Sequence, residues 1–292
     1  MKKKTLTTLL IVLIIAGLSL ILYPTVSDIL RSFAYKRTIS AFDSAVESLD
    51  DEKYEEMLEA AKDFNRRLVE KSYSLSMLTE KELAEYESLL DVSGNGVMGY
   101  ITIPKINVSL PIYHGTSDAV LQNGLGHLEG SSLPVGGEST HAIISGHTGL
   151  PSGKLFTDID QLTAGDTFTL RVLRDTLTYE VDQILIVLPH EVDALGIEEG
   201  QDYCTLLTCT PYGVNTHRLL VRGHRIPTPV TLDESKSPIE EALGLDDGLI
   251  FGIPAEIVLA AAFVLVVLVI LTVVLICRRR PKKTGGKYLK KK

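Results

Sequence analysis

Two predominantly apolar runs lie close to the ends of the chain. Leu6–Leu22 follows three lysines, and Ile257–Ile276 contains a single polar residue, Thr272. A helix rises about 1.5 Å per residue, so 20 residues span about 30 Å, the thickness of the hydrocarbon core of a bilayer. The pattern therefore predicts membrane-spanning helices over residues 5–23 and 254–276. No small-residue cleavage site follows the first run, which favours an uncleaved anchor over a signal peptide.

The two ends of the chain carry charge of one sign. Residues 1–4 and 277–292 contain lysine and arginine and no acidic residue. Basic residues beside a membrane helix stay on the cytoplasmic side, so the part between the two helices is expected outside the cytoplasm. Twelve of the 29 basic residues lie in these two ends. The rest of the chain therefore has 17 basic and all 37 acidic residues, which gives it a net charge of about −20. Such a surface repels phosphates, so nucleic acid is not an expected partner, whereas the membrane is.

Residues 24–95 show a helical pattern. Apolar side chains recur at helical spacing in two stretches, and Thr79 with Glu82 is typical of a capping box that opens a third helix. The stretches are marked by Ile39, Phe42, Val46 and Leu49, and by Met57, Ala61, Phe64 and Leu68. These helices could form a stalk or pack on the side of the next domain, and the pattern leaves both open.

Residues 96–228 are rich in glycine, proline and short alternating runs. Such runs predict a mainly β domain, a closed barrel or a sandwich of seven or eight strands. The expected strands are Gly99–Ile103, Val108–Tyr113, His141–Ser145, Thr167–Val172, Thr176–Ile186, Tyr203–Cys209 and Arg218–Ile226. Leu173-Arg174-Asp175 is expected to connect two of them as a hairpin. Residues 229–253 are interpreted as a linker to the second membrane helix.

Two cysteines, Cys204 and Cys209, fall in one expected strand. Their odd separation puts them on opposite faces, so they are not expected to form a disulfide. Cys277 lies at the predicted membrane edge. At least one free thiol is thus expected outside the cytoplasm, where an unpaired cysteine indicates a reactive thiol or a bond to another chain.

Cys209 is the candidate for chemistry, because it ends a strand just before Pro211-Tyr212-Gly213 turns the chain. A thiol needs a base or cationic neighbours to become a nucleophile. His147 lies in a glycine-flanked turn after a strand, and Arg218 begins the strand after Cys209. A hairpin would bring the guanidinium beside the thiol, where it could hold the oxygen of an acyl group. Taken singly, Cys209 could equally be a core residue and Arg218 a surface charge.

A metal site is the competing interpretation of the histidines. His141 with His147, or His127 with Glu129, could offer ligands, but neither pair has a standard ligand spacing. No metal or other cofactor is therefore expected.

Together these segments resemble the class C, pilin-polymerising sortases. Thr205-Leu206-Leu207-Thr208-Cys209 is similar to the family's TLxTC active-site signature. Further similar motifs follow the family's order over residues 97–227. They begin at Gly99-Tyr100-Ile101, Leu110-Pro111-Ile112, Gly126-His127-Leu128 and Ser145-Gly146-His147.

The resemblance implies a closed eight-stranded sortase-type β-barrel preceded by helices and flanked by the two membrane helices. It implies that Cys209 is the nucleophile, His147 the general acid and base, and Arg218 the residue that holds the substrate carbonyl, with Thr208 positioning substrate. The implied reaction is cleavage of an LPXTG-like sorting signal between Thr and Gly through a thioacyl enzyme. A lysine of a pilin would then take the acyl group, so pilins or surface proteins with such signals are the implied partners.

The chain departs from the family in one respect. Many class C enzymes carry a lid with an Asp-Pro-aromatic motif, and this chain has no Asp-Pro dipeptide. Either the lid is absent or another segment takes its part, with Ser72–Thr79 as the candidate. The competing functions are a cysteine protease that releases products to water, a non-catalytic pilus-assembly scaffold, and a surface adhesin.

Overall fold

The computed structural model describes residues 3–72, 75, 77–150, 153–229, 249–250 and 253–254. Residues 27–239 form one compact unit, and this unit holds all the candidate site residues. It is described here by itself. The predicted second membrane helix, residues 254–276, lies outside the described residues except for Pro254, and so does most of the predicted linker. Two short strands of the linker region are described, β9 (Leu249–Ile250) and β10 (Ile253–Pro254), which pair with each other.

Three helices precede the barrel: α1 (Lys3–Glu47), α2 (Asp51–Lys71) and α3 (Glu80–Ser88). Asp50 caps α2 by accepting a hydrogen bond from the Lys53 amide at 2.7 Å. The predicted capping box is confirmed at α3, since Thr79 and Glu82 each bond the other's backbone N–H. These caps satisfy amides that the first helical turn leaves without partners.

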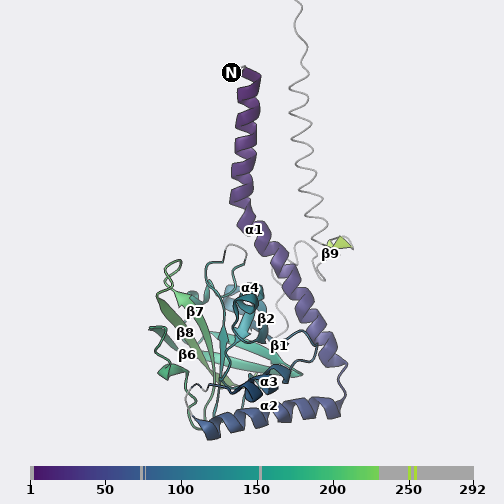
Figure 1. The fold of residues 1–292 in the computed structure, drawn as a ribbon, viewed down its shortest axis with the longest axis vertical. Helices are drawn as coiled ribbons and strands as arrows, with labels where there is room; N and C mark the ends of the chain where they lie inside the picture. The colour runs from purple at the N-terminus through teal and green to yellow at the C-terminus, as the bar shows by residue number, and fades with distance from the viewer. Residues whose placement is uncertain are drawn as a thin grey trace, which may run out of the picture. The chain divides into compact units, whose positions relative to one another are not determined.

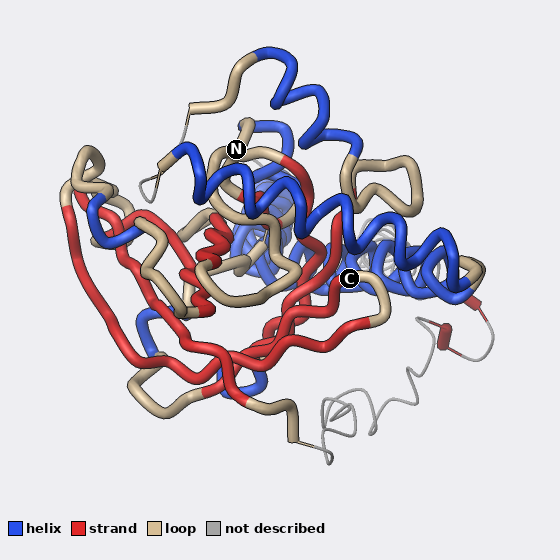
Figure 2. Tube along the Cα trace, turned by 90° about the horizontal axis from the view of Figure 1, so that it is seen from below, coloured by secondary structure: helices blue, strands red, loops and turns tan. Residues whose placement is uncertain are grey.

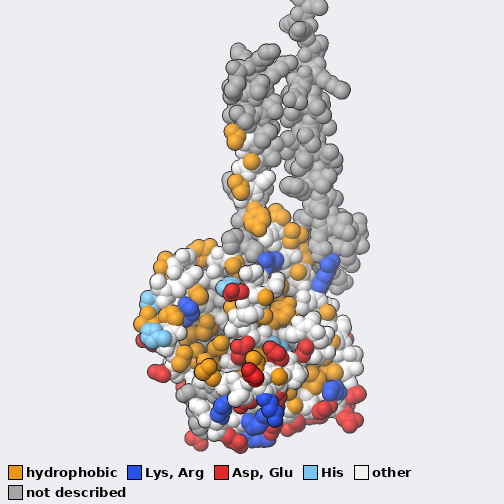
Figure 3. Space-filling model, viewed as in Figure 1, with side chains coloured by type: hydrophobic (Ala, Val, Ile, Leu, Met, Phe, Trp, Pro, Cys, Tyr) orange, Lys and Arg blue, Asp and Glu red, His pale blue; other side chains and the backbone are white. Residues whose placement is uncertain are grey.

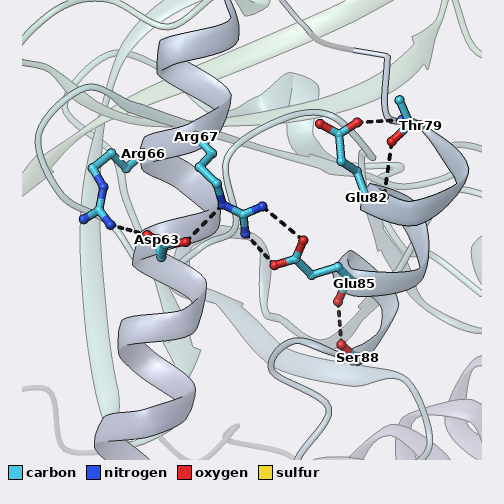
Figure 4. Close-up of polar contacts among 7 residues, drawn as sticks. All are labelled: Asp63, Arg66, Arg67, Thr79, Glu82, Glu85 and Ser88. Carbon is cyan, nitrogen blue, oxygen red and sulfur yellow. Dashed lines mark hydrogen bonds and ion pairs between the residues drawn. The ribbon is translucent and has the colours of Figure 1, made fainter.

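Ion pairs join α2 to α3, as Figure 4 shows. Arg67 on α2 donates to Asp63 one turn earlier at 3.0 Å and reaches across to Glu85 on α3. All three side chains are partly solvent-exposed, so the pairs add little to stability and mainly set how the two helices lie.

Eight strands close into a barrel, which confirms the predicted mainly β fold. Around the barrel the order is β1-β2-β3-β4-β7-β8-β6-β5, and the β1–β5 pair closes it. The β2–β3 and β4–β7 pairs are parallel, and the others are antiparallel. The strands are β1 (Val97–Ile103), β2 (Val108–His114), β3 (Leu125–His127), β4 (Thr140–Ser145), β5 (Thr167–Val172), β6 (Asp175–Val187), β7 (Asp202–Thr210) and β8 (His217–Ile226). Short helices lie between them: η1 (Pro104–Ile106), α4 (Asp118–Asn123), η2 (Ile159–Gln161) and η3 (Asp193–Leu195).

Strand β3 is the one that the sequence pattern missed. It has only three residues, and it pairs in parallel with β2 after the α4 crossover. Three residues are too few to show an alternation, so only the neighbouring strands define this one. The predicted hairpin between β5 and β6 is confirmed, and Leu173 takes a left-handed conformation in its turn.

The N-terminal helices pack on the barrel, which decides between the two possibilities left open by the sequence. The buried face of α2 joins the barrel core, and Phe42 and Val46 of α1 pack on Val97 of β1. Figure 1 shows α2 running beneath the barrel with α3 beside it, and Figure 2, seen from that side, shows a helix in front of the strands. Acidic side chains gather along this edge in Figure 3, mixed with a few basic ones.

The predicted first membrane helix, residues 5–23, falls within α1. In the part of the chain that the structure describes, no helix combines the length and the apolarity needed to cross a membrane.

Candidate active site

The exit of strand β7 places the candidate nucleophile. Strand alternation sends Cys204, Leu206 and Thr208 into the interior, where each is at most 3% exposed. Cys209 is half-buried at the end of the strand. Cys204 and Cys209 are both free thiols, as their odd separation predicted.

Arg218 lies directly across from Cys209. Strands β7 and β8 are antiparallel, and in their register Cys209 faces Arg218. Directly opposed residues share one face of a sheet, with Cβ atoms about 4.5–5.5 Å apart, so the guanidinium is within reach of the thiol. Arg218 Nη1 donates to the carbonyl oxygens of Asn215 at 3.3 Å and His217 at 3.0 Å. Among the described residues Arg218 forms no ion pair, so no carboxylate competes for it.

His147 leaves the neighbouring strand at the same end. Strands β4 and β7 run parallel, and their register reaches Ser145 opposite Leu207. It continues one residue further, because the Gly146 amide donates to Leu207 O at 3.0 Å and Thr208 Oγ1 donates to Gly146 O at 2.7 Å. His147 and Cys209 are the next residues on the two strands. His147, a half-buried residue, therefore lies in a loop whose first residue, Gly146, is bonded to β7 next to Cys209.

Glycines on both sides of His147 let this loop pack tightly. A Cβ on Gly146 would lie 2.6 Å from Leu125 Cδ2 and 2.7 Å from Phe156 Cδ2, so only glycine fits there. Gly149 has a φ of +72°, and a Cβ there would lie 2.9 Å from the ring of Tyr212. The loop after β4 and the loop after β7 thus touch each other.

Helix α1 holds the far end of the histidine loop. Asp28 Oδ1 accepts a hydrogen bond from the Lys154 amide at 2.9 Å, and Arg31 packs on Gly153. The helix that contains the predicted membrane anchor therefore also supports the loop that carries His147.

A pocket of about 290 Å³ opens at the exit of β7, with Cys209 in its wall. Its other residues are Thr148, Thr157, Asp158, Asp160, Gln161, Thr208, Thr210, Tyr212 and Leu219. His147 and Arg218 lie outside this lining, so the thiol is the member of the candidate triad that the pocket reaches. Thr148 lies in the motif that begins at Ser145, whereas no motif marked Thr157, Asp158, Asp160 or Gln161.

A separate apolar surface leads to Cys209 on the outer face of β7. Leu207, Leu220 and Leu185 lie in register across β7, β8 and β6, and they pack with Ile143. Leu75, from the segment between α2 and α3, packs against this surface. The segment suggested as a lid therefore places one apolar side chain on the face that leads to the thiol.

Two other histidines, His127 and His141, are buried and hydrogen-bonded. His127 Nε2 lies 2.8 Å from Ser132 O and its Nδ1 lies 3.0 Å from Tyr86 Oη, so Nε2 donates and Nδ1 accepts. Burial lowers the pKa of His127 to about 4. Burial also lowers the pKa of His141, whose ring nitrogens contact Gly196 O and Thr205 Oγ1.

Neither His127 nor His141 offers a free ring nitrogen to a metal. Within the described ranges, no group of three or more histidine, cysteine, aspartate or glutamate side chains could hold a metal ion.

Comparison with known proteins gives one family. A sortase domain matches residues 101–226. Among solved structures, sortase C1 of Streptococcus agalactiae is 52% identical, with a TM-score of 0.64 over 66% of this chain and 100% of that one. Sortase C of Streptococcus pneumoniae, in a structure described as giving insight into pilin substrate specificity, is 45% identical, with a TM-score of 0.60 and coverage of 66% and 100%. Sortase C of Clostridium perfringens, solved with its C-terminal cell wall sorting motif, is also 45% identical, with a TM-score of 0.58 and coverage of 66% and 99%.

The relatives found by sequence similarity are also sortases. Sortase D of Bacillus subtilis is 30% identical over 44% of this chain, which spans 63% of that protein's length. The sortase domain covers the barrel strands from β1 to β8, and the S. agalactiae structure is matched over its whole length. The chain therefore belongs to the sortase family of cysteine transpeptidases.

Proposed function

We propose that this chain is a membrane-anchored cysteine transpeptidase that joins sorting-signal proteins into pili. The observation that carries the proposal is the arrangement at one barrel end. Cys209 faces Arg218 across β7–β8, and the His147 loop is bonded to β7 immediately beside it. A nucleophile, a proton carrier and a fixed cation are the groups that acyl transfer through a thioester requires.

The first half of the proposed reaction forms the thioacyl enzyme. The Cys209 thiolate attacks the carbonyl carbon of Thr in an LPXTG-like signal, and Arg218 holds the oxygen that becomes negative. The Thr–Gly C–N bond breaks, and His147 gives its proton to the departing glycine amine. Arg218 suits this role because its planar guanidinium is always charged and is not neutralised by a carboxylate in the described part of the chain.

Thr208 has a positioning role in this scheme. Its hydroxyl donates its hydrogen to Gly146 O, so it is not available as a donor to substrate, and it fixes the strand end of the histidine loop to β7. A side chain that is 3% exposed acts here through the backbone that it holds.

The second half transfers the acyl group to an amine. A lysine amine attacks the thioester, His147 takes the proton, and the C–S bond breaks to return the thiolate. The product is an isopeptide bond, and water in place of the amine would give hydrolysis. The similarity to sortase C structures, one of them solved with a sorting motif and one described for pilin specificity, supports pilins with such signals as the partners.

The proposed location is the cell membrane, with the barrel outside the cytoplasm. Support comes from the two apolar runs, from the basic ends, and from Leu13, Leu20 and Tyr23 of α1, which are 57–75% exposed. Exposed apolar side chains of this size on a helix favour an apolar environment.

Mass spectrometry tests the function on the full chain in detergent micelles. With an LPXTG-type peptide alone, we expect a mass increase equal to the acyl fragment, lost in the Cys209→Ala variant. With a lysine-containing pilin fragment added, we expect a conjugate with an isopeptide bond. Acyl-enzyme that yields only hydrolysed peptide at every acceptor concentration would indicate a protease, and no acyl-enzyme at all would indicate a scaffold.

A further inference from the structure

The pocket beside Cys209 has charge of one sign. Asp158 and Asp160 are both in its lining, and no lysine or arginine is among the described residues that line it. Lys154, a mostly exposed side chain, lies 3.8 Å from Asp158, which is too long and too exposed for a strong pair. Asp160 forms no ion pair within the described part of the chain. The pocket therefore presents carboxylates to whatever enters it.

The end of β7 separates this pocket from the apolar surface. Thr208 faces Leu219 across β7–β8, and both line the pocket. Leu207 faces Leu220 on the opposite face of the same two strands, in the apolar surface covered by Leu75. Cys209, the last residue but one of β7, lies in the pocket lining and on the same face of the strand as Leu207. The thiol thus adjoins two sites of different chemistry.

Apolar side chains continue from the pocket along its own face. Leu219 lies opposite Ile186 of β6, which is 65% exposed although it is a large aliphatic residue. A ligand that suits both features has a cationic tip and a hydrocarbon stem, since such side chains lay the stem on apolar surface and keep the charge at a polar end. The volume of about 290 Å³ lies just below the range of sites for drug-sized ligands and fits a single extended side chain.

We propose that this acidic pocket binds the ammonium group of the lysine that accepts the acyl group, while the sorting signal lies on the apolar surface of Leu207. This inference rests on the proposed function and names the site of its second substrate. In the described ranges no group of three or more histidine, cysteine, aspartate or glutamate side chains could hold a metal ion, so an organic cation is favoured over a metal.

The protons balance in the following way. The ammonium loses one proton to water at the mouth of the pocket, and the neutral amine nitrogen attacks the thioester carbon. As the C–S bond breaks, the nitrogen gives its second proton to His147, and Cys209 leaves as a thiolate. The carboxylates concentrate the acceptor near the thioester and take no part in bond formation.

The partition of one thioacyl enzyme between amine and water tests the site. The full chain in detergent is given a fixed concentration of LPXTG-type peptide and a lysine peptide below saturation, and the conjugate-to-acid ratio is measured. In the Asp158→Asn/Asp160→Asn double variant we expect this ratio to fall on the order of tenfold, because the attraction is lost. The ratio does not depend on how fast the thioacyl enzyme forms.

Hydroxylamine serves as the uncharged acceptor. Its conjugate-to-acid ratio is expected to be the same in the double variant and the wild type. Glu199→Gln is the matched control, since Glu199 is an exposed carboxylate outside the pocket lining and is expected to change neither ratio. Raising the salt concentration to 1 M should shrink the difference seen with lysine, because salt screens exposed charges.

Two outcomes would overturn the inference. One is an unchanged lysine ratio in the double variant, and the other is an equal loss with lysine and hydroxylamine. In either case a wild type that forms the thioacyl enzyme and the lysine conjugate keeps the proposed function intact. A wild type that forms no thioacyl enzyme would instead refute the proposed function itself.

Discussion

The two cysteines of strand β7 are five residues apart and meet opposite surroundings. Cys204 is fully buried in the barrel core, and burial together with the nearby Asp202 raises its pKa well above the ordinary value. Cys209 stands half-buried at the strand's exit, opposite an arginine and beside a pocket. The thiol chemistry is the same at both positions. Which thiol can react is decided by the strand's alternation and by where the strand ends.

The largest effect is expected from removing each thiol in turn. Cys209→Ala should lower peptide cleavage at least about 10³-fold, because no other group forms the covalent intermediate. Cys204→Ala should keep cleavage within a fewfold and lower stability, since it removes buried sulfur from the core. Cleavage rates and thermal unfolding of both variants check this. A fully active Cys209→Ala variant would contradict the assignment of Cys209 as the nucleophile.

The arginines of β8 extend the comparison to the strand opposite. Arg222 donates to Asp182 and Glu198 and stacks over Tyr203, with its guanidinium carbon 4.0 Å from the ring centroid, whereas Arg218 bonds only backbone carbonyls among the described residues. Arg218→Lys should lower kcat/KM about 10²–10³-fold with little change in Tm, because an ammonium cannot reproduce the planar fork.

Arg222→Lys is the matched variant and should do the reverse. It weakens contacts that hold the barrel, so Tm should fall while kcat/KM changes little. Equal losses of kcat/KM in the two variants would contradict a special role for Arg218.

The pH dependence of stability should follow the buried histidines His127 and His141. An unfolded histidine titrates near pH 6.5, and native His127 has a pKa of about 4 because it is buried. As pH falls between these values, the unfolded chain binds a proton that the native state does not. The free energy of unfolding should therefore drop by roughly 3 kcal/mol from pH 6.5 to pH 4.

His141 adds to this loss with the same sign, since its pKa is also lowered by burial. Urea unfolding across this pH range measures the effect, and His127→Gln should show a shallower pH slope than the wild type. An unchanged slope in His127→Gln would mean that the titration belongs to another group.

The smallest effect is expected from the bond that ties the histidine loop to β7. Thr208→Val removes the donor to Gly146 O and leaves a buried carbonyl unpaired, which should cost about 1–2 kcal/mol of stability and several-fold in cleavage rate. Thr178→Val is the control, because Thr178 is equally buried but bonds Thr228, away from the candidate site. Similar stability losses with different cleavage rates would support positioning by Thr208.

Much of the barrel could be predicted from alternation alone. Seven of the strands follow runs of alternating or β-branched residues that are long enough to show their period, and the capping box marked α3. The facing of Cys209 and Arg218 was also predictable, because a hairpin ties their register to the turn between them. Strand β3 was not, since its three residues are specified by the parallel partner that the α4 crossover brings to them.

The amino-acid sequence by itself determined the local patterns: which strands alternate, which cysteine ends a strand, and which helices are capped. These depend on interactions a few residues apart along the chain. Only the tertiary structure decided what depends on distant segments meeting. It placed Asp158 and Asp160 in the pocket of Cys209, brought Asp28 of α1 onto the histidine loop, and laid Leu75 on the apolar surface. Barrel closure and the packing of the N-terminal segments on the barrel create these contacts, and no local periodicity encodes them.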